Sequence, residues 1–112
     1  MNKRFSGKTV VVTGGAAGLG RAHALAFAGE GAHLVLLDIN EADLAETRAL
    51  IDDLGSTASI HRVDMSDEQQ IIDFGKALLA DHDSIDVLIN NAGLHMGEIA
   101  RGFSGMGLAK WQ

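Results

Sequence analysis

The sequence predicts an α/β protein in which helices pack on both faces of a parallel sheet. Four short apolar runs, rich in Val, Ile and Leu, alternate with three segments of helical spacing in the order βαβαβαβ. The connections are short, and a glycine-rich turn follows the first run. Such alternation produces right-handed crossovers and parallel strands. We therefore expect a parallel sheet with two helices on one face and the third on the other.

The first strand is expected at residues 9–13, a β-branched run typical of a strand that is buried on both faces. A glycine-rich turn at residues 14–20 then leads into a helix at residues 21–29. Apolar and small residues recur there at helical spacing, so we expect them to face the sheet. This expected stripe consists of Ala22, Leu25, Ala26 and Gly29.

The second apolar run covers residues 33–37 and precedes a second helix. Asn40 is a suitable N-cap, with Asp43 three residues later, and Gly55 suits the position just after the helix end. The face of this helix that we expect to be buried consists of Leu44, Thr47, Ile51 and Leu54.

The third strand is expected at residues 59–63 and the fourth at residues 86–90. Between them, Ser66 and Gln69 form a possible capping box that opens a helix reaching to about Ala80. The fourth strand would be an apolar edge of the sheet, which predicts self-association through that edge.

Length and composition restrict the possible functions. The 112 residues fit one domain, so we treat residues 1–112 as a single, partial domain that ends in an irregular glycine-rich tail at residues 94–112. Fifteen acidic residues against nine basic ones disfavour a nucleic-acid surface. Apolar runs are too short for a signal sequence or a membrane span, and cysteine is absent. We expect a cytoplasmic protein without disulfides or thiolate metal sites.

The turn after the first strand has the composition of a phosphate-binding loop. Glycines permit positive φ and a close backbone approach to a pyrophosphate, and the following helix offers free N–H groups. A Walker-type loop would need Lys and then Ser or Thr where Arg21 and Ala22 stand, which excludes a P-loop ATPase. The spacing G-x-G-x-x-G also fails, because His23 would occupy its last position. The segment that remains is Thr13-Gly14-Gly15-Ala16-Ala17-Gly18-Leu19-Gly20.

The spacing T-G-x-x-x-G-x-G in this segment resembles the short-chain dehydrogenase/reductase family. Three later motifs agree with it: Asp38 closes the second strand, Asp64 closes the third, and Asn90-Asn91-Ala92-Gly93 closes the fourth. The resemblance covers about residues 5–93 and implies the N-terminal half of a Rossmann-like doubly wound NAD-binding fold, with the expected strand order 3-2-1-4. A glycine-rich turn that binds nothing is the alternative.

Each matched residue then has an implied place at the cofactor. The backbone N–H groups of the loop, including that of Leu19, would face the pyrophosphate. Asp38 would accept hydrogen bonds from the adenosine ribose and repel a 2′-phosphate, which favours NAD over NADP. Asp64 would bind the adenine amino group, and Asn90 would tie the fourth strand to its neighbours beside the cofactor. The full expected set is Gly14, Gly18, Leu19, Gly20, Asp38, Asp64, Met65, Asn90, Ala92 and Gly93.

Several of these residues also have a purely structural interpretation. Asp38 could be a solvated loop residue, and Asp64 could only support the turn before the next helix. We expect the side chain of Leu19 to pack against the protein, and Thr13 to brace the glycine loop by hydrogen bonding.

The catalytic residues of the family have no match in this sequence. The family transfers hydride with a Ser and a Tyr-x-x-x-Lys pair, but the chain contains no tyrosine. Lys110 is the only lysine after Lys76, and no asparagine follows Asn91 to match the catalytic asparagine of the family. The histidines lack metal-ligand spacing. No catalytic residue and no metal ligand is therefore assigned.

Three interpretations follow. The chain is the NAD-binding part of an oxidoreductase whose catalytic half is missing here, and the complete protein would act on an alcohol or carbonyl substrate. Alternatively, it binds NAD without catalysis, or it is an interaction module that keeps the fold. We favour the first because four motifs occur in the order that the family requires.

Overall fold

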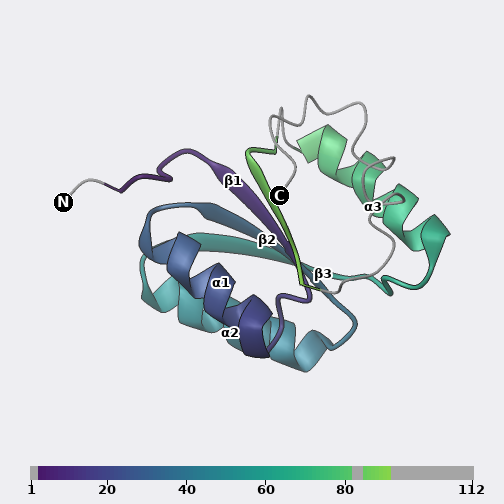
Figure 1. Ribbon diagram of the computed structural model, residues 1–112, viewed down its shortest axis with the longest axis horizontal. Coiled ribbons are helices and arrows are strands. Elements are labelled where there is room, and N and C mark those ends of the chain that lie inside the picture. Colours follow the sequence, from purple (N-terminus) through teal and green to yellow (C-terminus); the bar gives the residue numbers. More distant parts are fainter. Residues whose placement is uncertain (1–2, 82–84, 92–112) are drawn as a thin grey trace.

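Four strands and three helices make up the computed structural model, which describes residues 3–81 and 85–91 (Figure 1). The sheet is parallel throughout and has the order β3-β2-β1-β4, as the sequence predicts. The predicted tail at residues 94–112 lies outside the described residues. The elements are β1 (Thr9–Thr13), α1 (Gly18–Gly29), β2 (His33–Asp38), α2 (Glu41–Asp53), β3 (Thr57–Arg62), α3 (Glu68–Asp81) and β4 (Val87–Asn90).

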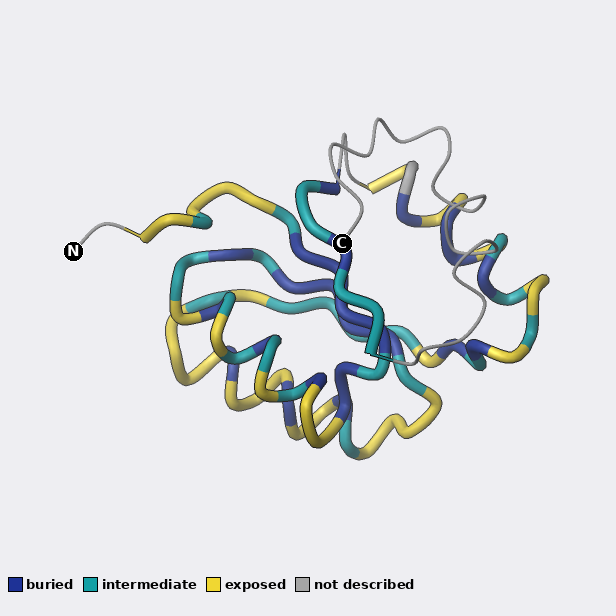
Figure 2. Tube along the Cα trace, in the orientation of Figure 1, coloured by how far each residue is buried: buried dark blue, intermediate teal, exposed yellow. Residues whose placement is uncertain are grey.

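The sheet has helices on both faces, with α1 and α2 on one and α3 on the other (Figure 1). Because successive strand residues point to opposite faces, each strand contributes to two cores. Val10 and Val12 of β1 face α1 and α2, whereas Val11 faces α3. All three are fully buried, as expected for a central strand that is covered twice. The two central strands, β1 and β2, are buried along most of their length, and the helices are buried at intervals (Figure 2).

Helix α1 buries a different stripe from the predicted one. It begins at Gly18 rather than Arg21, and the residues that face the sheet are Gly20, Ala24 and Ala28. The predicted stripe was wrong: Ala22, Ala26 and Gly29 are exposed, and Leu25 is only half buried. The observed stripe consists only of glycine and alanine. At Gly20 this small size is required, because α1 lies close to Gly14 at the start of the glycine loop.

Helix α2 begins as the sequence predicts. The Asn40 side chain accepts a hydrogen bond from the backbone N–H of Asp43 (3.0 Å), and Gly55 has a φ of +82° just after the helix. Leu44, Thr47 and Ile51 are buried. Leu54, however, is 46% exposed and lies just after the last residue of the helix, Asp53.

The boundaries around β3 and α3 differ from the prediction. Strand β3 covers residues 57–62 rather than 59–63. Helix α3 is capped by Asp67, not by Ser66. The Asp67 carboxylate accepts hydrogen bonds from the backbone N–H groups of Gln69 (3.0 Å) and Gln70 (3.2 Å). Ser66 is instead engaged with Asp64, so the predicted capping box does not form.

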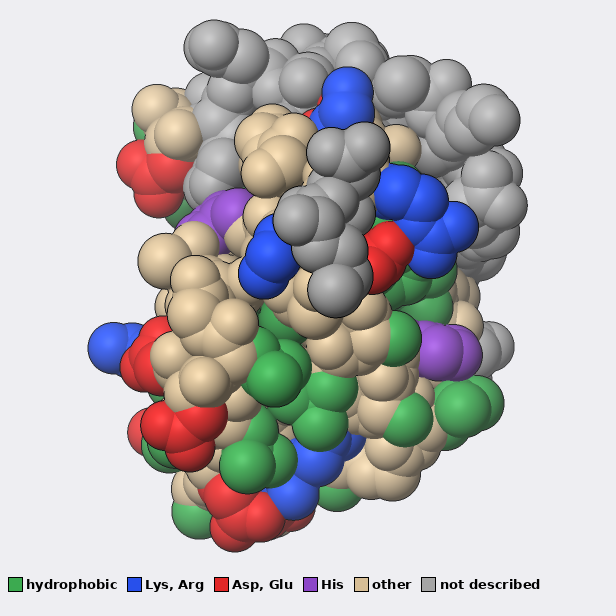
Figure 3. All heavy atoms as spheres, turned by 90° about the vertical axis from the view of Figure 1, so that its left-hand side faces the viewer, with side chains coloured by type: hydrophobic (Ala, Val, Ile, Leu, Met, Phe, Trp, Pro, Cys, Tyr) green, Lys and Arg blue, Asp and Glu red, His purple; other side chains and the backbone are tan. Residues whose placement is uncertain are grey.

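The surface carries charges of both signs. On the side seen in Figure 3, Lys and Arg side chains are interspersed with Asp and Glu among the described residues. No helix in the described part of the chain is both long and apolar enough to cross a bilayer. Within residues 3–81 and 85–91, no three His, Asp or Glu side chains are grouped in a way that could hold a metal ion.

Candidate nucleotide-binding site

Several of the predicted site residues lie together at the carboxyl edge of the sheet. In an open α/β sheet, this edge is where ligands bind. A pocket of about 210 Å³ opens there beside the ends of β1, β2 and β3. Its lining includes four of the predicted residues, Gly14, Asp38, Asp64 and Met65, together with Ile39, Val63 and Ser66. Ala92 and Gly93, the last two predicted residues, lie outside the described residues.

The glycine loop needs glycine at its three motif positions for identifiable reasons. Gly14 and Gly18 have φ values of +65° and +58°, in the left-handed region that side chains with a Cβ rarely adopt. At Gly20 the reason is space, because a Cβ would lie 1.8 Å from the carbonyl oxygen of Gly14. The loop is anchored to β2, since the N–H groups of Gly14 (2.8 Å) and Gly15 (3.2 Å) both donate to the Leu37 carbonyl.

The amino end of α1 offers hydrogen-bond donors next to this loop. The N-cap residue Ala17 gives no side-chain hydrogen bond, and the first turn holds no acidic residue. None of the described residues accepts a hydrogen bond from the N–H groups of Gly18, Leu19 or Gly20. These donors, at the positive end of the helix dipole, form an arrangement suited to an anion.

Leu19 differs from the prediction in one respect. We expected its side chain to pack against the protein, but it is 66% exposed. The residue lies in the first turn of α1, on the side away from the sheet, because Gly20 takes the position that faces β1 and the loop. What Leu19 can offer a ligand through a polar group is therefore its backbone N–H.

Asp38 links the end of β2 to the glycine loop. Its Oδ2 accepts a hydrogen bond from the N–H of Ala16 (3.2 Å), and its Oδ1 accepts from the N–H groups of Ile39 (2.7 Å) and Asn40 (3.2 Å). A carboxylate has about four lone-pair sites, so these three donors leave room for another one. Asp38 also lines the pocket.

Asp64 supports the turn between β3 and α3. Its Oδ1 accepts hydrogen bonds from the Ser66 hydroxyl (2.6 Å) and the Ser66 backbone N–H (2.9 Å). These bonds, the hydroxyl first, lower the pKa of the Asp64 carboxyl below its ordinary value, and the charge of Arg62 acts in the same direction. Oδ2 has no hydrogen-bond partner among the described residues, so the structural role leaves one oxygen available at the pocket.

The pKa of Asp64 provides a first testable prediction. Replacing Ser66 with alanine removes the larger of the two hydrogen-bond effects, so the pKa of Asp64 should rise toward its ordinary value. The carboxyl carbon of Asp64, followed by NMR during a pH titration, measures this directly. Because the folded-state pKa is the lower one, the Ser66 contacts stabilise the fold at neutral pH. That contribution is lost as the pH falls through the folded-state pKa.

A matched substitution controls for this experiment. Ser66→Thr keeps the hydroxyl and should keep the low pKa of Asp64. If the alanine and threonine variants titrate alike, the Ser66 hydroxyl is not the cause of the lowered pKa.

Asn90 ties β4 to β1, as the resemblance implies. The Thr13 hydroxyl donates to Oδ1 of Asn90 (2.9 Å), and the backbone N–H of Asn91 donates to the Thr13 carbonyl (3.3 Å). Thr13, which we expected to brace the glycine loop, thus bonds to the neighbouring strand. Met65 also has a structural role, because its side chain is buried in the core between the sheet and α3.

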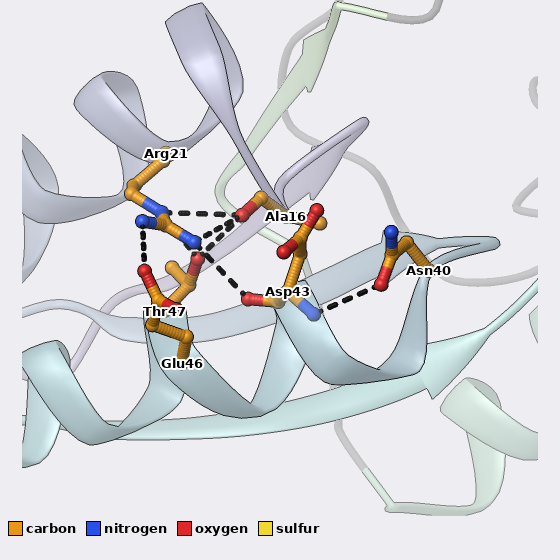
Figure 4. Close-up of polar contacts among 6 residues, drawn as sticks. All are labelled: Ala16, Arg21, Asn40, Asp43, Glu46 and Thr47. Atoms are coloured by element: carbon orange, nitrogen blue, oxygen red, sulfur yellow. Dashed lines mark hydrogen bonds and ion pairs between the residues drawn. The ribbon is translucent and has the colours of Figure 1, made fainter.

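Analysis of the sequence missed a polar cluster behind the loop, drawn in Figure 4. The guanidinium of Arg21 and the hydroxyl of Thr47 both bond to the carbonyl oxygen of Ala16. Two signals could have indicated it. Arg21 directly follows the last glycine of the loop, and Thr47 is the one polar member of an otherwise apolar helix face.

Comparison with known proteins agrees with this geometry. The model of the short chain dehydrogenase family matches residues 8–112. The Mycobacterium tuberculosis protein EphD is 41% identical over 90 residues, which are 80% of this chain and 15% of EphD. The sorbitol dehydrogenase of Cereibacter sphaeroides is 41% identical over 91 residues, which are 81% of this chain and 34% of that enzyme. The chain thus spans about a third or less of the length of these relatives.

Solved structures of related proteins have the same fold. A xylitol dehydrogenase bound to NAD⁺ superposes with a TM-score of 0.73 and 34% identity, over 77% of this chain and 33% of that one. A metagenomic short-chain oxidoreductase in complex with NADP superposes with a TM-score of 0.84 and 29% identity, over 91% of this chain and 57% of that one. Together with the family match over most of the sequence, these likenesses show that the chain belongs to the short-chain dehydrogenase family.

Proposed function

We propose that this chain forms the nicotinamide-dinucleotide-binding part of an oxidoreductase. In the complete protein it would serve hydride transfer between NAD and an alcohol or carbonyl substrate. The observation that carries the proposal is that the glycine loop, through Gly14, lines a pocket together with Asp38 and Asp64 and leads into N–H groups of α1 that have no acceptor among the described residues. Donors for a pyrophosphate thus lie beside acceptors for a ribose and an adenine. Structures of relatives with NAD⁺ and with NADP support this choice of ligand.

Each part of the dinucleotide would meet a different element. The amino end of α1 would hold the pyrophosphate, with Gly14, Gly18 and Gly20 allowing the close approach. Asp38 would accept hydrogen bonds from the adenosine ribose, and Asp64, next to Met65, would accept one from the adenine amino group. Asn90, held by Thr13, would lie beside the nicotinamide ribose with Ala92 and Gly93. The bound cofactor supplies the nicotinamide ring that accepts or donates hydride.

We propose further that NAD is preferred over NADP. A 2′-phosphate would bring negative charge close to the Asp38 carboxylate. Ala17, before the second motif glycine, and Ile39, after Asp38, are uncharged. Arg62, the neighbour of Asp38 in β3, pairs with Glu41 (3.7 Å).

Titration of the full chain with NAD by isothermal titration calorimetry tests the proposal. We expect saturable NAD binding that adenosine competes for, and weaker binding of NADP. Binding of none of the three ligands would contradict the assignment of this site. Gly18→Val, which places a β-branched residue at a positive φ and a side chain beside the proposed pyrophosphate, should bind NAD less well than the wild type.

A second candidate function is a non-catalytic NAD-binding or interaction module. These 112 residues contain no tyrosine, the acid/base that the resemblance implies, so by themselves they would bind the cofactor without transferring hydride. A chain that binds NAD but forms no NADH from any alcohol tested fits either a part of an enzyme or a binding module. A chain that binds no nucleotide but captures a protein partner would favour the interaction module.

We also propose that copies of the chain self-associate along β4 and that the protein is cytoplasmic. Strand β4 is an edge of the described sheet, and its backbone groups on the outer side can pair with another strand. Sedimentation over a range of concentrations should show a dimer or larger species, and a monomer throughout would contradict this. Fractionation of cells that express a tagged protein tests the location.

A further inference from the structure

The carbonyl oxygen of Ala16, in the middle of the glycine loop, is held by two side chains from different helices (Figure 4). Arg21 of α1 approaches it with Nε (3.1 Å) and Nη2 (2.8 Å), and the Thr47 hydroxyl of α2 donates to it at 2.8 Å. Nε of Arg21 also lies 2.9 Å from the Thr47 oxygen. The three residues therefore form one connected group behind the loop.

This group is shielded from water. Thr47 is fully buried, and the Arg21 side chain is only 23% exposed. Hydrogen bonds from a charged donor in such a setting are stronger than neutral ones. On its other side, Ala16 donates its N–H to Asp38. Side chains from α1, α2 and β2 thus hold both polar groups of this one residue.

Holding this carbonyl has a consequence for α1. In a helix that extended one residue further toward the amino end, the carbonyl of Ala16 would accept a hydrogen bond from the N–H of Gly20. Here Arg21 and Thr47 occupy that carbonyl instead. The first bond of α1 is therefore the one from the N–H of Arg21 to Ala17 (3.3 Å), and the N–H of Gly20 has no acceptor among the described residues.

We propose that Arg21 and Thr47 are positioning residues for the pyrophosphate of the cofactor, an inference that rests on the proposed function. By holding the carbonyl of Ala16, they keep the N–H of Gly20 without an acceptor among the described residues and hold the loop that leads into the N–H groups of Gly18 and Leu19. The loop is then ready for an anion before the anion arrives. This lowers the cost of ordering it on binding.

Calorimetric titration of four variants of the full chain with NAD and with adenosine tests this inference. Thr47→Val keeps the shape but removes the hydroxyl, and Arg21→Lys keeps the charge but removes the forked geometry. Both should weaken NAD binding about tenfold, the loss expected for a hydrogen bond to a charged group. Adenosine, which has no pyrophosphate, should bind to both as to the wild type. Thr47→Ser should restore NAD binding.

Glu46 provides the matched control. It pairs with Nη1 of the same Arg21 (2.7 Å) but is 63% exposed and does not touch the loop carbonyl. Glu46→Gln should leave NAD binding unchanged, because exposed ion pairs contribute little. Wild-type affinity for NAD in Thr47→Val and Arg21→Lys would overturn the proposal. Equal losses for NAD and adenosine would overturn it too, since the residues would then only join α1 to α2.

A ligand-free measurement separates this inference from the proposed function. Amide hydrogen exchange by NMR should show the N–H of Gly20 exchanging freely in the wild type and Glu46→Gln. In the double variant Arg21→Met/Thr47→Val it should be protected, because no side chain then holds the carbonyl of Ala16, which can accept it. Unchanged exchange would overturn the positioning role even if NAD binds. Conversely, the variant could show this protection of Gly20 while the wild type binds no NAD. That result would contradict the proposed function but not the positioning role.

Discussion

Replacing Gly20 with alanine is expected to abolish NAD binding and to lower the free energy of unfolding by about 3 kcal/mol. The new Cβ would lie 1.8 Å from the carbonyl oxygen of Gly14, 2.7 Å from its carbonyl carbon and 3.1 Å from the Cα of Gly15. All three are backbone atoms, which cannot move aside as the end of a flexible side chain can. Relief of the clash would require α1 to move away from the loop.

Such a movement would disturb both the glycine loop and the amino end of α1. The N–H of Gly14 bonds to the Leu37 carbonyl, so the loop cannot shift without breaking its attachment to β2. The amino end of α1 carries the donors proposed for the pyrophosphate, so a displaced helix would no longer present them. Urea denaturation measures the stability, and calorimetry with NAD measures the binding.

Gly29→Ala is the matched control, because Gly29 lies in the same helix and nothing lies within 4 Å of the Cβ it would gain. Alanine is the better helix former, so this variant should be as stable as the wild type or up to about 1 kcal/mol more stable. It should bind NAD normally. If Gly20→Ala behaved like Gly29→Ala, the close approach of α1 to Gly14 would be disproved.

Replacing Asp38 with asparagine is expected to reduce the preference for NAD over NADP by about tenfold or more. Two unit charges about 4 Å apart repel by about 1 kcal/mol in bulk water and by about 4 kcal/mol near a protein surface. The asparagine removes this repulsion of the 2′-phosphate but keeps one oxygen as an acceptor. Titrations with NAD and NADP at the same ionic strength give the ratio of affinities.

Two further variants separate charge from structure. Asp38→Ala also removes the acceptor for the N–H groups of Ala16, Ile39 and Asn40, so it should weaken NAD binding beyond the effect of asparagine. Asp52→Asn removes an exposed carboxylate near the other end of α2 and should leave the ratio unchanged. If Asp38→Asn had the same ratio as the wild type, the assignment of Asp38 to cofactor selection would be wrong.

Features that depend on neighbouring residues in the chain could be predicted from the sequence. The β-branched run of β1, the N-cap pair Asn40 and Asp43, and the positive φ of Gly55 are local, and the structure confirms each. The order β3-β2-β1-β4 was also predicted, because the motifs resemble those of a doubly wound fold with this strand order.

Features that depend on contacts between distant residues were predicted less well. The small and apolar residues of α1 are compatible with more than one inward-facing stripe, so its buried side could not be chosen without the sheet. Ser66 and Asp67 are both good N-cap residues. The Ser66 hydroxyl bonds to Asp64, and Asp67 caps α3. A local sequence pattern is compatible with several buried faces or capping residues. Which one forms depends on the tertiary contacts that are available to each side chain.

The sequence by itself determined the family, the alternation of strands and helices, and the glycine spacing of a nucleotide loop. These features depend on the order of the residues and on their local backbone preferences. Only the tertiary structure decided how that loop is held. Folding brings together the four segments that carry Ala16, Arg21, Asp38 and Thr47. Hydrogen bonds between such segments do not produce a repeating pattern in the sequence, so they could not be predicted from it.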